Sequence, residues 1–175
     1  MEGTCLMQQL SKKLYWIFPI LALAACSFNG QYRSQLMPCT ITATADCWDA
    51  AIQYENNGQG EYHLGFIEFD DQGQLRQRQQ LEAVLDYFYN IAAHDDVILT
   101  VFAHGWHHDA DVNDTNVQEF QKLLRQLAAA EALGSEQDKR AKRKILGVYL
   151  GWRGDSIEIP VVNHLTFWDR KSTAQ

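Results

Sequence analysis

The densest group of side chains able to do chemistry lies in a short stretch around residue 108. Its imidazoles and carboxylates are His104, His107, His108, Asp109, Asp111 and Asp114. Imidazole and carboxylate groups are ligands that zinc prefers, so a metal-dependent hydrolase would use this loop. No later pair of histidines or cysteines completes a ligand shell. We therefore keep the metal site as an alternative hypothesis and expect no cofactor.

The same stretch begins where an apolar run, residues 96–103, ends. Loops at the carboxyl ends of such strands are where α/β proteins bind ligands. A strand that ends in His104-Gly105 resembles the oxyanion-hole segment of the α/β-hydrolase superfamily, in which glycine lets the backbone approach the substrate. The resemblance implies that Gly105 provides the turn, that the backbone N–H of Trp106 donates to the oxyanion, and that His104 shapes the loop.

A second stretch strengthens this resemblance. Residues 149–156, followed by residues 163–171, are similar to the next strand and the start of the next helix in a group of bacterial α/β-hydrolase-like proteins. Together the two stretches carry the likeness from about Asp96 to Ala174.

The nucleophile of that family sits in a Gly-x-Ser-x-Gly elbow on the following strand, and the acid and histidine of the triad come later in the chain. No Gly-x-Ser-x-Gly sequence occurs here. We therefore expect the N-terminal part of a serine-hydrolase fold, esterase or lipase-like, truncated before the elbow and catalytically incompetent alone. A small-molecule ester would be its substrate only if the missing part is supplied.

One serine offers a different interpretation. The sequence Gly154-Asp155-Ser156-Ile157 resembles the Gly-Asp-Ser-Leu block of another esterase family, and it follows a predicted strand. That family needs a later Asp-x-x-His, which the 19 residues after Ser156 do not contain. We therefore interpret Ser156 as a loop serine.

Three short apolar runs, residues 63–69, 96–103 and 144–151, predict the strands that position this loop. The second and third runs are nearly continuous in apolar residues, which predicts strands covered on both faces. Helical spacing of apolar residues predicts helices over residues 81–91 and 117–127. The alternating order predicts an α/β fold with right-handed crossovers, and the resemblance makes it a partial α/β-hydrolase-like sheet, three-layered and mostly parallel, lacking its C-terminal strands.

The ends of the second helix have their own signals. Thr115 with Gln118 three residues later predicts a capping box at its start, and Gly134 predicts its end.

The resemblance also predicts an unprotected strand. In the α/β-hydrolase sheet the strand with the nucleophile pairs with the strand that ends in His-Gly. Without that partner, Val97 to Phe102 becomes a sheet edge, and the apolar area beside it is exposed. We expect self-association through this edge.

The N-terminus predicts export. Lys12 and Lys13 precede an apolar stretch of twelve residues, which is too short to span a bilayer and is typical of a signal peptide. The sequence up to Cys26, Leu-Ala-Ala-Cys, resembles the lipobox of bacterial lipoproteins, which implies removal of residues 1–25 and a diacylglycerol lipid on Cys26. An ordinary cleavage that leaves Cys26 as a plain thiol is the alternative. By analogy with Gram-negative lipoproteins, Ser27 favours the outer membrane, facing the periplasm.

The start of translation is a separate question. The segment before Lys12 is long and contains an acidic residue, whereas a start at Met7 gives an ordinary signal peptide. We hypothesise that Met7 is the true start.

These features divide the chain into a signal peptide over residues 1–25, a tether and N-terminal segment over residues 26–60, and the truncated domain over residues 61–175. The polar stretch from Asn29 to Pro38 is the expected tether. In an oxidising periplasm, Cys39 and Cys47 are expected to form a disulfide.

The overall charge limits the partners. The 175 residues contain 15 Lys and Arg against 22 Asp and Glu, a net charge of −7, which is the wrong sign for a protein that coats nucleic acid. The basic run over residues 139–144 lacks interleaved aromatic residues and is interpreted as a solvated loop. We expect no nucleic-acid partner and a membrane attachment through lipidated Cys26. A non-enzymatic surface or binding lipoprotein is the alternative function.

Overall fold

The computed structural model describes residues 30–42, 46–58, 60–70, 72–105 and 108–152. The strands in this part of the chain are β1 (Cys39–Thr40), β2 (Ile52–Asn56), β3 (Glu61–Phe69), β4 (Val97–Ala103) and β5 (Lys144–Trp152). The helices are α2 (Arg78–Ala92) and α3 (Thr115–Asp138). The three predicted strands and two predicted helices are therefore all present, and β1 and β2 are additional.

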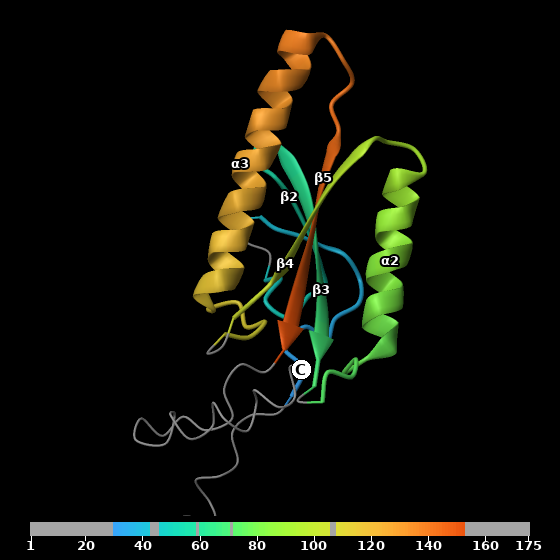
Figure 1. Ribbon diagram of the computed structural model, residues 1–175, viewed down its shortest axis with the longest axis vertical. Helices are drawn as coiled ribbons and strands as arrows, with labels where there is room; N and C mark the ends of the chain where they lie inside the picture. The colour runs from blue at the N-terminus through green and yellow to red at the C-terminus, as the bar shows by residue number, and fades with distance from the viewer. Residues whose placement is uncertain (1–29, 43–45, 59, 71, 106–107, 153–175) are drawn as a thin grey trace, which may run out of the picture.

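The strands form one sheet in the order β1-β2-β3-β5-β4. Strands β3, β5 and β4 are parallel, and β2 is antiparallel to β3. The chain moves outward from β3 to β4 through α2 and back to β5 through α3. Because these two steps cross the sheet in opposite directions, right-handed crossovers put α2 and α3 on opposite faces, as Figure 1 shows. The predicted α/β fold with three layers and a mostly parallel sheet is confirmed.

Two glycines allow the helices to lie close to the central strands. A Cβ at Gly147 of β5 would lie 2.5 Å from a methyl group of Leu124 on α3. A Cβ at Gly65 of β3 would lie 2.5 Å from a methyl group of Val84 on α2. Each helix therefore packs onto a strand at a point where any larger residue would clash.

Two apolar cores result, one under each helix. The core under α3 includes the fully buried Phe66, Leu124 and Tyr149. The core under α2 includes Val84 and Leu146. The sheet is thus the shared wall between two separate apolar layers.

Strand β4 corrects one prediction. The near-continuous apolar run predicted burial on both faces, but Leu99 and Val101 are each 56% exposed. Their neighbours Ile98 and Phe102, on the other face, pack against the core under α3. The reason is position, since β4 is the last strand of the sheet within the described residues and α2 packs over the inner strands.

Two further predictions, on where α3 is capped and where it ends, are wrong. The N-cap is Asp114, whose side chain accepts from the N–H of Asn116, rather than Thr115. The helix continues past Gly134 to Asp138, and Lys139 then takes the left-handed conformation.

The basic run after α3 is partly neutralised. Buried Glu131 accepts hydrogen bonds from both Arg140 and Arg143, with an Arg143 Nη2 distance of 2.7 Å. These two guanidinium groups hold the pKa of Glu131 far below its ordinary value. Lys144 pairs with Glu61. The run therefore ties the end of α3 to the start of β5.

The expected tether is folded from residue 30 onward. Arg33 is fully buried, its Nε donates to the carbonyl of Ala110 at 2.8 Å, and Gln35 forms a parallel bridge with Ala50. The expected division at residue 60 also falls inside the sheet, because β2 and β3 pair across it. Local polarity suggested a tether, but long-range hydrogen bonds fix this segment.

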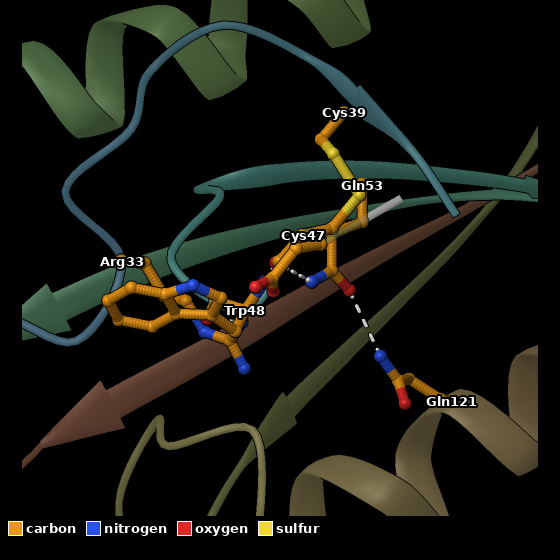
Figure 2. Close-up of a disulfide and its surroundings, with 7 residues drawn as sticks. Arg33, Cys39, Cys47, Trp48, Gln53 and Gln121 are labelled. Carbon is orange, nitrogen blue, oxygen red and sulfur yellow. Dashed lines mark hydrogen bonds between the residues drawn. A yellow bond between two sulfur atoms is a disulfide. The ribbon is translucent and has the colours of Figure 1, made fainter. Parts of the chain in front are cut away.

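Cys39 and Cys47 form a disulfide beside this segment, as Figure 2 shows. The side chain of Gln53 on β2 donates to the carbonyl of Cys47 at 2.8 Å and accepts from Gln121 on α3 at 3.0 Å. The disulfide loop is therefore connected to both the sheet and α3. Neither of the two described helices has a stretch apolar enough to cross a membrane.

Candidate functional site

The candidate site lies at the carboxyl edge of β4 and β5, where His104 is buried. The main-chain N–H of Trp152 donates to His104 Nε2 at 2.8 Å, so this nitrogen carries no proton. Nδ1 therefore carries the ring proton and donates to the carbonyl of Gly105 at 2.8 Å. Burial lowers the pKa of His104, which keeps the ring neutral. Both nitrogens are occupied, so this imidazole is neither a free base nor a metal ligand.

The ring of His104 also joins the two strands by stacking. It lies parallel to the indole of Trp152, with ring centroids 5.4 Å apart and an interplanar angle of 4°. The indole Nε1 donates back to the carbonyl of His104 at 3.0 Å. Tyr149 also stacks against the ring of His104, with ring centroids 5.7 Å apart. These contacts fasten the end of β4 to the end of β5.

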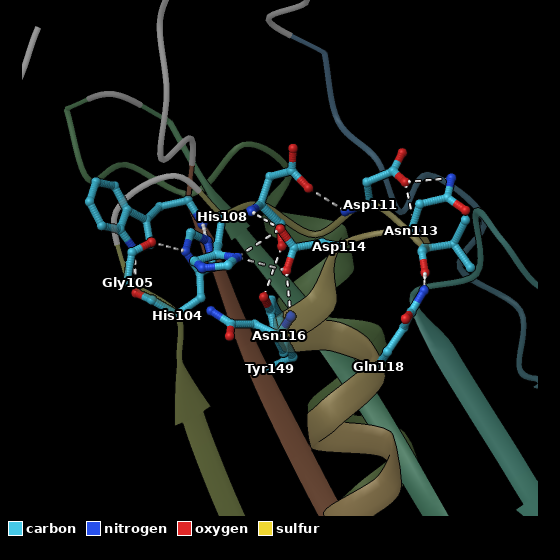
Figure 3. A network of polar contacts seen from close by, with 12 residues as sticks. His104, Gly105, His108, Asp111, Asn113, Asp114, Asn116, Gln118 and Tyr149 are labelled. Carbon is cyan, nitrogen blue, oxygen red and sulfur yellow. Dashed lines mark hydrogen bonds and ion pairs between the residues drawn. The ribbon is translucent and has the colours of Figure 1, made fainter. Parts of the chain in front are cut away.

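A second histidine is held by a carboxylate at the start of α3. His108 Nδ1 lies 3.1 and 3.2 Å from the two carboxylate oxygens of Asp114 (Figure 3). The same carboxylate accepts from the N–H of Asn116 at 2.8 Å and of Asp109 at 3.2 Å. Asp114 is therefore fixed by the helix N-terminus, and it orients the ring of His108. An imidazole bonded to a carboxylate through Nδ1 keeps Nε2 for a proton or a ligand.

The remaining carboxylates of this loop hold its backbone. Asp109 accepts from the N–H of Asp111 at 2.8 Å, and Asp111 accepts from the N–H of Asn113 at 2.7 Å. The hydroxyl of Tyr149 donates to the carbonyl of Asp109 at 2.8 Å. In the part of the chain that the structure describes, no group of three or more potential ligands is placed to hold a metal ion.

The structure thus separates the residues that the sequence grouped together. His104 belongs to the junction of β4 and β5, whereas His108 belongs to the N-terminus of α3. His107 and Trp106 lie outside the described residues, as do Cys26 and Ser156, so the roles given to these four remain predictions.

Two charged residues at this edge were not singled out in the sequence. Glu68, at the end of β3, is buried, and its carboxylate accepts from the main-chain N–H groups of Tyr32 and Arg33. Arg33 reaches from there to the carbonyl of Ala110, and its guanidinium lies 4.0 Å from the ring of Phe66. Burial lowers the pKa of Arg33 to about 10. Glu68 thus fixes the main chain at Arg33, and Arg33 in turn contacts the loop at Ala110.

No spacing or motif in the sequence marks Arg33 or Glu68. An isolated arginine in a polar stretch and a glutamate at a strand end are both ordinary surface features. The one available signal concerns Glu68. A glutamate is unusual inside the apolar run of residues 63–69, because it interrupts a strand that is otherwise expected to be buried.

Comparisons with protein-family models, with curated proteins and with solved structures found no match for this chain.

Proposed function

We propose that the protein is a lipid-anchored cell-envelope protein whose domain carries the oxyanion-hole half of a serine-hydrolase site and does not hydrolyse esters alone. The observation that carries this proposal is the use of both ring nitrogens of His104. One accepts from Trp152 and the other donates to Gly105, so the histidine holds a backbone loop in place. This arrangement supports the loop-shaping role that the resemblance to α/β-hydrolases implies for His104.

The hydrogen bond from His104 fixes the carbonyl of Gly105, where the loop begins. Gly105 is exposed, and a Cβ there would meet nothing within 4 Å, so there is open space beside the backbone for a substrate. The resemblance assigns the oxyanion donor to the next residue, Trp106, which lies outside the described residues. A preorganised donor of this kind contributes about 10²–10³ to kcat in acyl transfer.

The nucleophile is the part that we propose is supplied from outside this sequence, because no Gly-x-Ser-x-Gly occurs in it. A fluorophosphonate probe that reacts with activated serines tests this directly. We expect no labelled serine on the purified chain, while a known serine esterase in the same mixture is labelled. Specific labelling that disappears in Ser156→Ala would contradict the proposal.

The anchor is tested separately. The Cys39–Cys47 disulfide is consistent with a compartment outside the cytoplasm. We expect the mass of the N-terminal peptide to include a diacylglycerol on Cys26, and we expect Cys26→Ser to lose both the lipid and the membrane fraction. An unmodified cysteine at residue 26 in envelope preparations would overturn this part.

A further inference from the structure

The described part of the chain starts against the carboxyl edge of the sheet. Gly30 lines a narrow hollow with Asp109 and Trp152, beside the candidate site. The next residues are tied down, because the N–H of Tyr32 donates to Glu68 at 2.9 Å. In Figure 1 the blue start of the coloured ribbon lies by the arrowheads of β3 and β5. The N-terminal connection therefore leaves the domain at the edge that carries the site.

The distance from this edge to the anchor is short. Cys26 precedes Gly30 by four residues, and an extended chain spans at most about 3.6 Å per residue, so the connection reaches about 14 Å. This step rests on the lipidated Cys26 of the proposed function. Because the acyl chains of such an anchor lie in the bilayer, Gly30 stays within about that distance of the lipid surface, and the part of the carboxyl edge beside it stays near the bilayer.

An aromatic side chain is exposed at the same place. Trp48 is 54% exposed and lines a hollow of about 350 Å³ with Gln31, Tyr32 and Asp111. Its carbonyl accepts from Nη1 of buried Arg33, so its backbone is fixed although the indole is in solvent. Tryptophan has an apolar ring with one polar N–H and is enriched where membranes meet water.

The charges around Trp48 favour one kind of lipid. Asp46 accepts from the N–H of Trp48, Asp49 follows it in the chain, and Asp111 shares its hollow. Carboxylates are repelled by anionic headgroups, whose surface potential is negative. The surface therefore suits a zwitterionic phospholipid.

We propose that the lipid on Cys26 and the indole of Trp48 together hold the carboxyl edge of the sheet against a bilayer of zwitterionic phospholipid. In this orientation the His104–Gly105 loop faces the membrane. The ligands that reach it are amphipathic esters presented at the bilayer surface, such as acyl esters of membrane lipids, rather than esters free in solution.

The test places one probe beside Trp48, with the indole left in place, and a second probe far from it. Gln31→Cys and Leu133→Cys variants, purified with their native N-terminal lipid, are labelled with an environment-sensitive fluorophore and placed in phosphatidylcholine vesicles; Gln31 lines the same hollow as Trp48. Cys39 and Cys47 are joined to each other, and in the proposed lipoprotein Cys5 is removed with the signal peptide and the sulfur of Cys26 carries the lipid, so the introduced thiol is the one that reacts. Leu133 is the matched control, because it is 61% exposed and lies near the far end of α3.

Vesicles that contain nitroxide-labelled phospholipid then quench a fluorophore that lies close to the bilayer. We expect severalfold stronger quenching at position 31 than at position 133, with a blue-shifted emission at position 31 alone. Equal quenching at the two positions, or weaker quenching at position 31, would overturn the proposed orientation.

The mass of the N-terminal peptide separates this result from the proposed function. If Cys26 carries its lipid and the probe at position 31 stays unquenched, the proposed orientation is wrong while the anchor stands. If Cys26 carries no lipid, the proposed anchor is wrong, and the proposed orientation is wrong with it.

Discussion

Strands β4 and β5 lie side by side and both contain a nearly continuous apolar run, yet they are buried to very different extents. Leu99 of β4 pairs with Leu146 of β5, and the exposed fractions of these two leucines are 56% and 2%. Val101 pairs with Val148, at 56% and 9%. An apolar run therefore predicts a strand correctly, but the burial of that strand depends on its place in the sheet and on the helix above it.

The difference follows from how the chain crosses the sheet. The step from β3 to β4 passes over β5, so α2 packs on the inner strands and leaves one face of β4 open. The other face of β4 is covered, because Ile98 and Phe102 pack into the core under α3. A right-handed connection from β5 to a position outside β4 would run over the α2 face, where Leu99 and Val101 are exposed.

The largest expected effect comes from shortening the paired leucines. Leu146→Ala removes a side chain buried under α2 and should lower the free energy of unfolding by about 2–5 kcal/mol. Leu99→Ala should change it by no more than about 0.5 kcal/mol, because that side chain is mostly in solvent. Urea denaturation of both variants measures the difference. Similar losses in the two variants would mean that something covers β4.

The second effect concerns the stability of the protein at acid pH. It is expected at β3, because β4 has no side chain that titrates. Burial lowers the pKa of His63 to about 4, and its Nδ1 lies 2.9 Å from the hydroxyl of Tyr87. The unfolded chain, with a histidine pKa near 6.5, binds a proton that the folded chain excludes. The free energy of unfolding should therefore fall as the pH drops from about 6.5 to 4, by at most about 3 kcal/mol from this group.

His63→Gln is the variant that isolates this contribution, because its amide still has a polar atom for Tyr87. The stability of the wild type and of the variant should converge as the pH falls through this range, measured by denaturation at each pH. Parallel curves would show that His63 does not contribute to the acid dependence.

A third effect concerns the contact between β5 and α3. Gly147→Ala places a Cβ against Leu124 and should lower the free energy of unfolding by about 1–3 kcal/mol. Gly134→Ala is the matched control, since its new Cβ meets nothing closer than a guanidinium nitrogen of Arg140 at 3.6 Å. In the interior of α3 it should raise stability by about 0.5–1 kcal/mol. Thermal unfolding of both variants distinguishes a close approach from a tolerant glycine.

The smallest effect on stability, and the most informative about partners, is expected at the edge itself. Within the described residues β4 has a strand partner on one side only, so its outer N–H and C=O groups favour pairing with a second chain, and we expect association that increases with concentration. Val101→Lys should weaken it and change the free energy of unfolding by no more than about 0.5 kcal/mol. Leu133→Lys, on α3, is the control. Sedimentation velocity that shows a monomer at every concentration would refute this expectation.

Much of the fold was predictable because its signals are local. The runs around Phe66, Val101 and Val148 have strand composition, and the helical spacing from Leu81 and from Val117 requires a covered face. The errors fall where tertiary contacts decide. Asp114 rather than Thr115 caps α3, where its carboxylate also holds His108.

The candidate site was predictable only in part. The sequence placed His104 at a strand end, but it also grouped this residue with His108 as a metal ligand. Neither the donor from Trp152, 48 residues away, nor the support from Arg33 has a local signature. Both depend on the parallel alignment of β4 and β5 and on the packing of residues 30–35 against the sheet.

The sequence by itself determined the alternation of strands and helices, the loop at the end of the second predicted strand, and the residue types that the loop carries. These follow from apolar periodicity and from turn chemistry, which act over a few residues. The tertiary structure alone decided that β5 lies between β3 and β4, that one face of β4 stays open, and that the ring of His104 is neutral and fully bonded. These depend on contacts between distant residues, whose burial and hydrogen bonds exist only once the sheet has formed.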